Sequence, residues 1–334
     1  LTGKMVSVSP FIDSYTQGVD GMCSPKDFET LLQMAYLYYT APRFVEEEFA
    51  ASMNQLKAVV PNLVSQPNFK LQTELVKVIY GNNPRRFVIS PEMLEKVSVP
   101  TIERVYKSLF SNAAGSVVRI VGNVNPEEIK PLVEKYIGSI PTGKKAPKWV
   151  DTKEELVKGH IHHHFDTQMT TPKSTVVLVA SADMKNTLEN TVLASAVNYI
   201  LDLIYTETIR EEEGGTYGVS SFGSIAELPK NQYVLQIAFD TDPEKAHKLI
   251  ELANAGLNSL AENGPSADFL AKAKENFLKN IPENHISNSY WKGQLGDYYR
   301  YGKDFDTEYE KVVKALTAEQ VQAFVQEVLS QENF

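Results

Sequence analysis

An arginine and a tyrosine lie seven positions apart on either side of a glycine pair. Residues 209–219 read Ile-Arg-Glu-Glu-Glu-Gly-Gly-Thr-Tyr-Gly-Val, which places Arg210 before the pair and Tyr217 after it. A guanidinium offers a fixed fork of donors for a carbonyl or carboxylate, and a phenol can donate to an oxyanion as it develops. The segment therefore predicts a substrate-binding or transition-state-stabilising site. The alternative interpretation is structural, with Arg210 paired to Glu211–Glu213 or to a helix end and Tyr217 simply packed.

Four of the six histidines lie in one short segment, His160-Ile161-His162-His163-His164, with Asp166 close behind. If this segment is a strand, His160, His162 and His164 project from one face, at a spacing that lets two of them share an ion. We favour a polar strand with solvated imidazoles. Adventitious zinc or nickel binding by the cluster is the alternative.

The sequence contains no HExxH, HxxEH, GxSxG, GxGxxG or Walker motif, so the common zinc, serine-nucleophile and nucleotide sites are not encoded here. His247 lies on a predicted amphipathic helix, and we expect it at the surface. Cys23 precedes a helix start, which can lower a thiol pKa, but a structural thiol is the simpler interpretation.

Composition sets the frame for these candidates. The 334 residues are 43% hydrophobic, and 33 Lys+Arg against 42 Asp+Glu give a formal charge of −9. The length suggests about two domains, and the acidic balance disfavours nucleic acid as a partner. One cysteine excludes an intramolecular disulfide, and no apolar run approaches the roughly 20 residues of a membrane span. The chain begins at Leu1, not Met, so we expect a piece of a longer protein.

In the first half, the pattern predicts a helix capped by Ser24-Pro25 that ends at Ala41-Pro42, and a second helix from Val45 that Pro61 closes. Residues 116–122 are predicted to form a buried strand. Asn125-Pro126 is predicted to cap the helix that follows.

Residues 141–159 are rich in lysine, proline and glycine and are predicted to link two domains, residues 1–148 and 149–334. In the second half, strands are predicted at 174–181 and 232–239. A long helix from Thr187 is expected to end at Gly214-Gly215, with Tyr217 opening a strand.

The two halves share a pattern. Residues 24–62 run cap-proline, helix, short break and a helix ending near Pro61, and residues 242–284 repeat this order with a helix ending near Pro282. We interpret the pattern as two related α+β units. The alternative is that any two amphipathic helix pairs look alike.

Arg210 and Tyr217 match in type and spacing a signature in the C-terminal half of pitrilysin-family zinc peptidases, the inverzincins that include insulin-degrading enzyme. Further stretches resemble the third and fourth domains of long bacterial members, in the same order: Leu1–Gly21, Tyr39–Phe44, Val121–Asn123, Tyr136–Pro141 and Asn288–Trp291. The resemblance covers nearly the whole chain.

The resemblance implies two related pitrilysin-like (metallohydrolase-like) α/β sandwich units within an α+β chain, each a mostly antiparallel sheet packed on helices, the first truncated at its start. Family catalysis uses HxxEH and a distal glutamate in the N-terminal half, and this chain has neither. We therefore expect the C-terminal half of a zinc endopeptidase that encloses unfolded peptides. Zinc is expected in the missing half and no metal or cofactor in this chain, which alone is expected to be inactive.

By the same resemblance, Arg210 and Tyr217 are expected to complete the site from the opposite wall. The partners are then a peptide substrate and an N-terminal half or zinc-carrying subunit, and strand edges are expected to add an extended peptide. The bacterial periplasm or cell envelope is the expected compartment. The alternative is a catalytically inactive partner or scaffold subunit. A third interpretation, a ferredoxin-like small-molecule enzyme, has no cofactor motif to support it.

Overall fold

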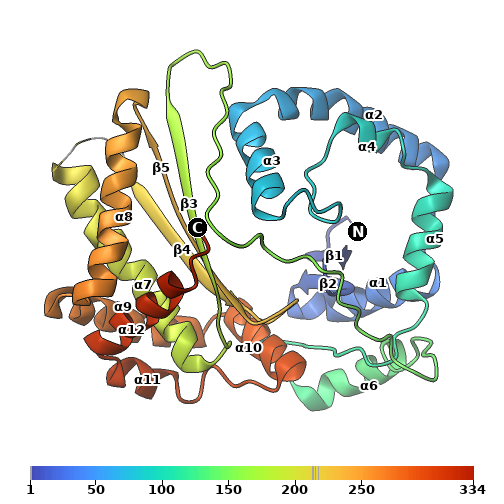
Figure 1. Ribbon diagram of the computed structural model, residues 1–334. Helices are drawn as coiled ribbons and strands as arrows, with labels where there is room; N and C mark the ends of the chain where they lie inside the picture. The colour runs from blue at the N-terminus through green and yellow to red at the C-terminus, as the bar shows by residue number, and fades with distance from the viewer. Residues whose placement is uncertain (1, 213, 215, 217) are drawn as a thin grey trace. The chain divides into compact units, whose positions relative to one another are not determined.

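The computed structural model describes residues 2–212, 214, 216 and 218–334, and its contacts divide the chain into two compact units. The first comprises Leu1–Phe69 and Val88–Asp151, and the second comprises Lys70–Phe87 and Thr152–Phe334. Each unit has its own antiparallel sheet (Figure 1).

The first unit pairs two strands and covers them with a helix. Strands β1 (Val6–Ile12) and β2 (Gln17–Cys23) are antiparallel, and α1 (Phe28–Thr40) contacts both strands after a short 3-10 turn, η1 (Pro25–Asp27). The remaining helices of this unit are α2 (Glu46–Ser65), α4 (Pro91–Leu94), α5 (Val99–Phe110) and α6 (Pro126–Tyr136). Helix α3 (Pro67–Ile79) begins in the first unit and lies mostly in the second.

Ser24 does not cap the helix amides as the sequence predicts. Its hydroxyl instead donates to Asp27 Oδ2 at 2.8 Å, and the same carboxylate oxygen accepts from the Met5 amide at 3.0 Å. Asp27 is only 5% exposed. The bond from Ser24, with that from Met5, lowers the pKa of Asp27. This buried carboxylate therefore ties the chain before β1 to the start of α1.

The second unit is built on a three-stranded antiparallel sheet in the order β3-β5-β4. Its strands are β3 (Ser174–Asp183), β4 (Val219–Ala226) and β5 (Gln232–Thr241). The helical elements are α7 (Leu188–Tyr205), η2 (Thr206–Glu212), η3 (Pro243–Lys245), α8 (Ala246–Asn263), α9 (Ala267–His285), α10 (Asn288–Tyr301), α11 (Tyr309–Ala315) and α12 (Ala318–Ser330).

One face of this sheet is buried under helices α7, α8 and α12 (Figure 1). Strand β5 alternates in burial, so Tyr233, Leu235, Ile237 and Phe239 all point into the core. Residues Leu188–Glu211 are long and apolar enough for a membrane span by length and composition. Because α7 residues line the same core as β5, this segment is accounted for as the central helix of the unit.

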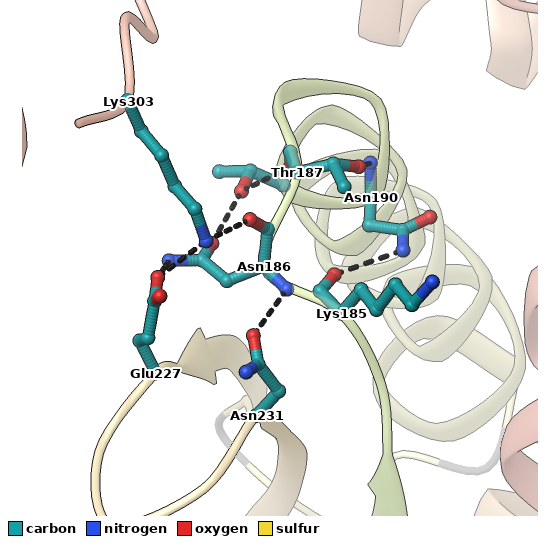
Figure 2. A network of polar contacts seen from close by, with 8 residues as sticks. Lys185, Asn186, Thr187, Asn190, Glu227, Asn231 and Lys303 are labelled. Carbon is teal, nitrogen blue, oxygen red and sulfur yellow. Dashed lines mark hydrogen bonds and ion pairs between the residues drawn. The ribbon is translucent and has the colours of Figure 1, made fainter. Parts of the chain in front are cut away.

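Three loops of the second unit meet in one polar network (Figure 2). The Lys303 ammonium donates to Asn186 O at 2.6 Å and pairs with the Glu227 carboxylate. The amide N–H of Asn186 donates to Asn231 Oδ1 at 2.9 Å. The network joins the turn between β3 and α7, the turn between β4 and β5, and the loop between α10 and α11.

The order of elements confirms two related units. The first unit runs β1-β2-η1-α1-α2, and the second repeats it as β4-β5-η3-α8-α9. Each second helix carries a proline, Pro61 or Pro282, at its sixteenth residue, counting from Glu46 or Ala267. The α+β class with antiparallel sheets packed on helices is also confirmed.

Several local predictions are corrected. Pro61 does not end its helix, because a proline in the last turns removes a single helical hydrogen bond and the helix continues to Ser65. The second helix ends at His285, near Pro282 as predicted. Residues 116–121 pair with no strand among the described residues, and Val117 and Val118 are about half exposed. An apolar run becomes a strand only where a neighbouring strand takes its backbone hydrogen bonds.

The other main predictions are confirmed. Thr187 caps α7, Asn125 caps α6, and β3 and β5 cover the predicted strand segments. Strand β4 begins at Val219 rather than at Tyr217, which lies outside the described residues. No helix or strand occurs in residues 137–173, which include the segment 141–159 predicted as a linker.

Candidate functional site

The candidate site begins where α7 changes its helical pitch. At Thr206 the helix becomes π-helical, and this segment, η2, continues to Glu212. Single turns of π-helix are rare and are frequent at functional sites. Arg210 lies on this turn, and its side chain is exposed. In the part of the chain that the structure describes, Arg210 has no ion-pair partner.

Two fully buried side chains anchor the turn from the opposite side. Tyr205 and Ile209 have 0% exposure, and the Tyr205 hydroxyl donates to Ala253 O of α8 at 2.9 Å. Burial raises the pKa of Tyr205, so the hydroxyl stays a neutral donor. Gly256 makes room for the ring, since a Cβ there would lie 2.8 Å from Tyr205 Cε1. The base that carries Arg210 is therefore rigidly packed.

Threonine side chains bond to backbone carbonyls at the change of pitch. Thr206 Oγ1 donates to Asp202 O at 2.7 Å, and Thr208 Oγ1 donates to Ile204 O at 2.8 Å. Such bonds to the carbonyl four residues earlier often bend helices. They supply donors to carbonyls just where the regular α-helical pattern ends, which stabilises the π turn locally.

Two side chains of α7 bind the edge of β4. Asp202 Oδ1 accepts from the Ser221 amide at 2.8 Å and lies 2.7 Å from Ser221 Oγ. One turn earlier, Asn198 Nδ2 donates to Gly223 O at 2.8 Å. The Ser221 hydroxyl is also 2.9 Å from Asn198 O, so its one proton has two acceptors. We call these four residues the α7–β4 clamp.

Gly223 is required where the clamp meets the core. A Cβ at this position would lie 2.4 Å from the Tyr233 hydroxyl and 2.7 Å from Asn198 Oδ1. The glycine lets the Tyr233 ring cross β4, where it packs edge-on against Phe324 at 5.1 Å. Among the described residues, neither Tyr233 OH nor Asn198 Oδ1 has a hydrogen-bond partner.

The predicted site residues are placed only in part. Arg210 is on η2, and Tyr217 lies outside the described residues. Gly214 has a positive φ of 56°, the left-handed conformation expected of glycine at a bend. The proposed interaction of both side chains with a substrate therefore remains a prediction.

The histidine cluster does not converge on one point. His160 stacks on Phe334 with ring centroids 5.8 Å apart, His163 Nε2 is 3.3 Å from Glu74, and His164 Nε2 is 3.3 Å from Asp166. Within residues 2–212, 214, 216 and 218–334, no three His, Cys, Asp or Glu side chains gather as a metal site would require. These donors do not fit zinc, which needs at least three converging protein ligands.

The two other single candidates also have structural surroundings. Burial, helped by the charge of Asp27, raises the pKa of the Cys23 thiol, the opposite of what a reactive thiolate needs. His247 is exposed and lies 3.4 Å from Glu251 one turn along α8, as expected of a surface residue.

Strand edges near the site are already bonded within the chain. The clamp takes the Ser221 N–H and Gly223 C=O on the edge of β4. On β3, the Ser181 amide donates to Asn333 O at 3.0 Å, and the end of the chain lies beside this strand (Figure 1). An extended peptide adding at these positions would have to displace these bonds, which disfavours them as docking sites.

Sequence reasoning missed Asn198 and Asp202. The available signal was their spacing of four residues within an otherwise strongly apolar helix, which places two polar groups on one face.

Comparison with known proteins identifies relatives of matching fold. "Zinc protease PQQL-like" of Arabidopsis thaliana is 26% identical over 286 residues, which is 79% of this chain and 29% of that protein. "Probable zinc protease PqqL" of Escherichia coli is 24% identical over 300 residues, 84% of this chain and 30% of that protein. The chain thus spans under a third of the length of these relatives.

Solved structures agree on the fold. The crystal structure of the periplasmic protease PqqL from E. coli superposes with a TM-score of 0.83 at 21% identity, covering 98% of this chain and 36% of that one. The first half of the same protease superposes with a TM-score of 0.70 at 13% identity, covering 99% of this chain and 74% of that one. The chain therefore shares its fold with the first half of that protease as well.

A family profile covers the centre of the chain. Residues 96–277, more than half of the sequence, match the family described as "Peptidase M16 inactive domain". This span includes β3, α7, η2 and β4, and so contains Arg210 and the α7–β4 clamp. Together with the superposed structures, it confirms the pitrilysin-like resemblance: the chain belongs to the peptidase M16 inactive-domain family.

Proposed function

We propose that this chain is the non-metal-binding C-terminal half of a zinc-dependent endopeptidase that encloses and cleaves unfolded peptides. The observation that carries the proposal is Arg210, an exposed guanidinium without an ion-pair partner among the described residues, on a π-helical turn anchored by the fully buried side chains of Tyr205 and Ile209. An exposed arginine next to a packed helical turn is suited to hold a peptide backbone.

In this proposal Arg210 holds the substrate backbone or orients Tyr217, and Tyr217 donates a hydrogen bond to the oxyanion that forms at the scissile carbonyl. Donors aimed at developing charge commonly contribute on the order of 100-fold or more to the rate. Zinc supplies Lewis-acid chemistry from the N-terminal half, since the donors described in this chain do not fit it.

The proposal assigns residues 1–148 and 149–334 to the third and fourth domains of a four-domain enzyme. The division of contacts near Asp151 and Thr152 supports this boundary, although Lys70–Phe87 belong to the second unit. The partner is the N-terminal half or a zinc-carrying subunit, and the similarity to the first half of PqqL supports pairing of two like folds. We propose a bacterial periplasmic location, because the E. coli relative is described as periplasmic.

The second candidate is a catalytically inactive partner or scaffold subunit. The family description "inactive domain" and the lack of HxxEH in this sequence fit this candidate as well as they fit the first. The parent reading frame distinguishes the two. An HxxEH segment upstream, or in an adjacent chain, supports the peptidase, and its absence from both supports the scaffold.

The test replaces each proposed group in the complete protein, or in this chain mixed with its zinc-carrying half. Arg210→Ala and Tyr217→Phe are each expected to lower kcat/KM on an unstructured fluorogenic peptide about 100-fold. This chain alone should cleave no peptide.

Arg104→Ala and Tyr299→Phe serve as matched controls. Arg104 is exposed on α5, and Tyr299 is 60% exposed on α10. Both are expected to leave turnover unchanged. If Arg210→Ala and Tyr217→Phe also stay within about threefold of the parent, a difference worth only about 0.65 kcal/mol, the assigned roles are wrong.

A further inference from the structure

We propose that Asp202, supported by Asn198, is a positioning residue for the bend that carries Arg210 and Tyr217. This inference rests on the proposed function. The Asp202 carboxylate joins α7 to Ser221 of β4, and these two residues bracket the whole bend. Asp202 precedes Arg210 by eight residues, and Ser221 follows Tyr217 by four. The clamp therefore joins α7 to β4, the two elements between which the sequence places both groups.

The spacing of the clamp allows one alignment of helix and strand. Asn198 and Asp202 are four residues apart on α7, a rise of about 6 Å. Their partners Gly223 and Ser221 are two residues apart on β4, about 6.6 Å along a strand. Both bonds form together only when the two elements keep this register, so sliding along either axis breaks them.

The charge of Asp202 is partly buried on the face of α7 that meets β4. The residue lies near the end of α7 in a strongly apolar helix that continues as η2 to Glu212. Among the described residues Asp202 has no cation partner, and it is partly buried. Apolar packing would join α7 to β4 without the free-energy cost of a partly buried carboxylate, but it would not fix the register of the two elements. The carboxylate thus lowers the stability of the fold but fixes the alignment of α7 and β4.

The expected effect follows from how strongly rates depend on placement. A displacement of about 1 Å at a reacting group can cost on the order of 100-fold. Asp202→Ala removes both contacts to Ser221, and we expect kcat/KM of the complete enzyme to fall between about 10- and 100-fold. Asp202→Asn retains an acceptor oxygen in the same place, and we expect it to stay within about threefold.

Thr317→Ala is the stability-matched control. Thr317 forms the capping box of α12 in the same unit, remote from the bend in sequence, and its loss is expected to cost about 1 kcal/mol. Turnover is measured at the same temperature for all variants, below the unfolding transition of each. Amide hydrogen exchange is followed in the segments Thr206–Glu212 and Val219–Ala226.

Support for the proposal is a large loss of kcat/KM and faster exchange in both segments for Asp202→Ala, with neither change for Asp202→Asn or Thr317→Ala. The proposal is overturned if Asp202→Ala matches Thr317→Ala in turnover, or if Asp202→Asn loses as much as Asp202→Ala. If Asp202→Ala does not fold, Ser221→Ala replaces it. That variant removes the hydroxyl but keeps the amide bond, and it must lower kcat/KM at least about threefold.

Arg210→Ala and Tyr217→Phe are measured in the same series. If these two variants keep full turnover, the proposed function fails. The exchange data then still report whether Asp202 orders the segments Thr206–Glu212 and Val219–Ala226. If they lose turnover and Asp202→Ala does not, the proposed function stands and the positioning role of Asp202 is rejected.

Discussion

Two tyrosines with the same burial differ in what their hydroxyls meet. Tyr205 and Tyr233 are both 0% exposed in the core of the second unit, and burial raises the pKa of each. The Tyr205 hydroxyl donates to Ala253 O, whereas the Tyr233 hydroxyl has no partner among the described residues. A buried hydroxyl without a hydrogen bond costs free energy, so the pair allows a matched comparison.

We expect Tyr233→Phe to leave the free energy of unfolding unchanged or to increase it. Tyr205→Phe is expected to decrease it by about 1 kcal/mol, because it removes an existing hydrogen bond from a side chain that is buried to the same extent. Urea unfolding followed by circular dichroism measures both. A loss for Tyr233→Phe as large as that for Tyr205→Phe would show that the Tyr233 hydroxyl is bonded in solution.

The buried Asp27 carboxylate makes the first unit sensitive to acid. Its hydrogen bonds from Ser24 and Met5 lower its pKa below the usual value near 4. The stability that these bonds contribute is complete above that value and is lost as pH falls through the lower pKa of the folded state.

We therefore expect Asp27→Asn to be less stable than the parent at pH 7 and the difference to shrink towards pH 3. Denaturant midpoints of the two proteins at pH 7, 5 and 3 measure this. Asp13→Asn is the control, because Asp13 is exposed on the turn between β1 and β2. If the difference in denaturant midpoint between the parent and Asp27→Asn is the same at all three pH values, the lowered pKa of Asp27 does not contribute to stability.

At the scale of elements, stability depends on how loops are joined. Lys303 connects three loops of the second unit through Asn186 and Glu227, and both charged side chains are partly buried (Figure 2). Removing one member of such a pair leaves the other charge poorly solvated.

We expect Lys303→Met to lower the free energy of unfolding by about 1 to 3 kcal/mol, since bonds to charged groups are the stronger ones. Lys311→Met is the matched control. Lys311 pairs with Glu308 at 2.6 Å on the surface, with its side chain 81% exposed, and should cost less than about 1 kcal/mol. Chemical denaturation compares them, and equal losses would show that the network adds nothing beyond a surface pair.

At the scale of the whole molecule, the chain should fold without metal. The histidines of residues 160–164 have separate partners, and the described residues hold no group of three metal-ligating side chains. A ligand that binds only the native state at 100 times its Kd would add about 2.7 kcal/mol to stability.

We expect EDTA to leave the Tm of this chain unchanged and elemental analysis to find far less than one zinc per chain. The His162→Ala, His164→Ala double variant is the control and should behave as the parent. Stoichiometric zinc that this variant loses would restore the histidine cluster as a metal site.

The sequence by itself determined the elements whose signals are local. The cap at Thr187, the alternation of Gln232–Phe239 and the paired prolines of the repeated helices all depend on near neighbours, and they predict β5, α7 and the two related units. The type and spacing of Arg210 and Tyr217 likewise predict a site before any fold is known.

Only the tertiary structure decided which apolar segments pair as strands and which polar side chains bond to another element. Residues 116–121 are as apolar as a strand but pair with none in the described chain, because pairing depends on a distant partner. The π turn under Arg210 and the bonds from Asp202 and Asn198 to β4 arise where α7 packs on a strand that begins after a bend. Contacts between residues far apart in sequence carry no local signal, so their geometry appears only when the chain has folded.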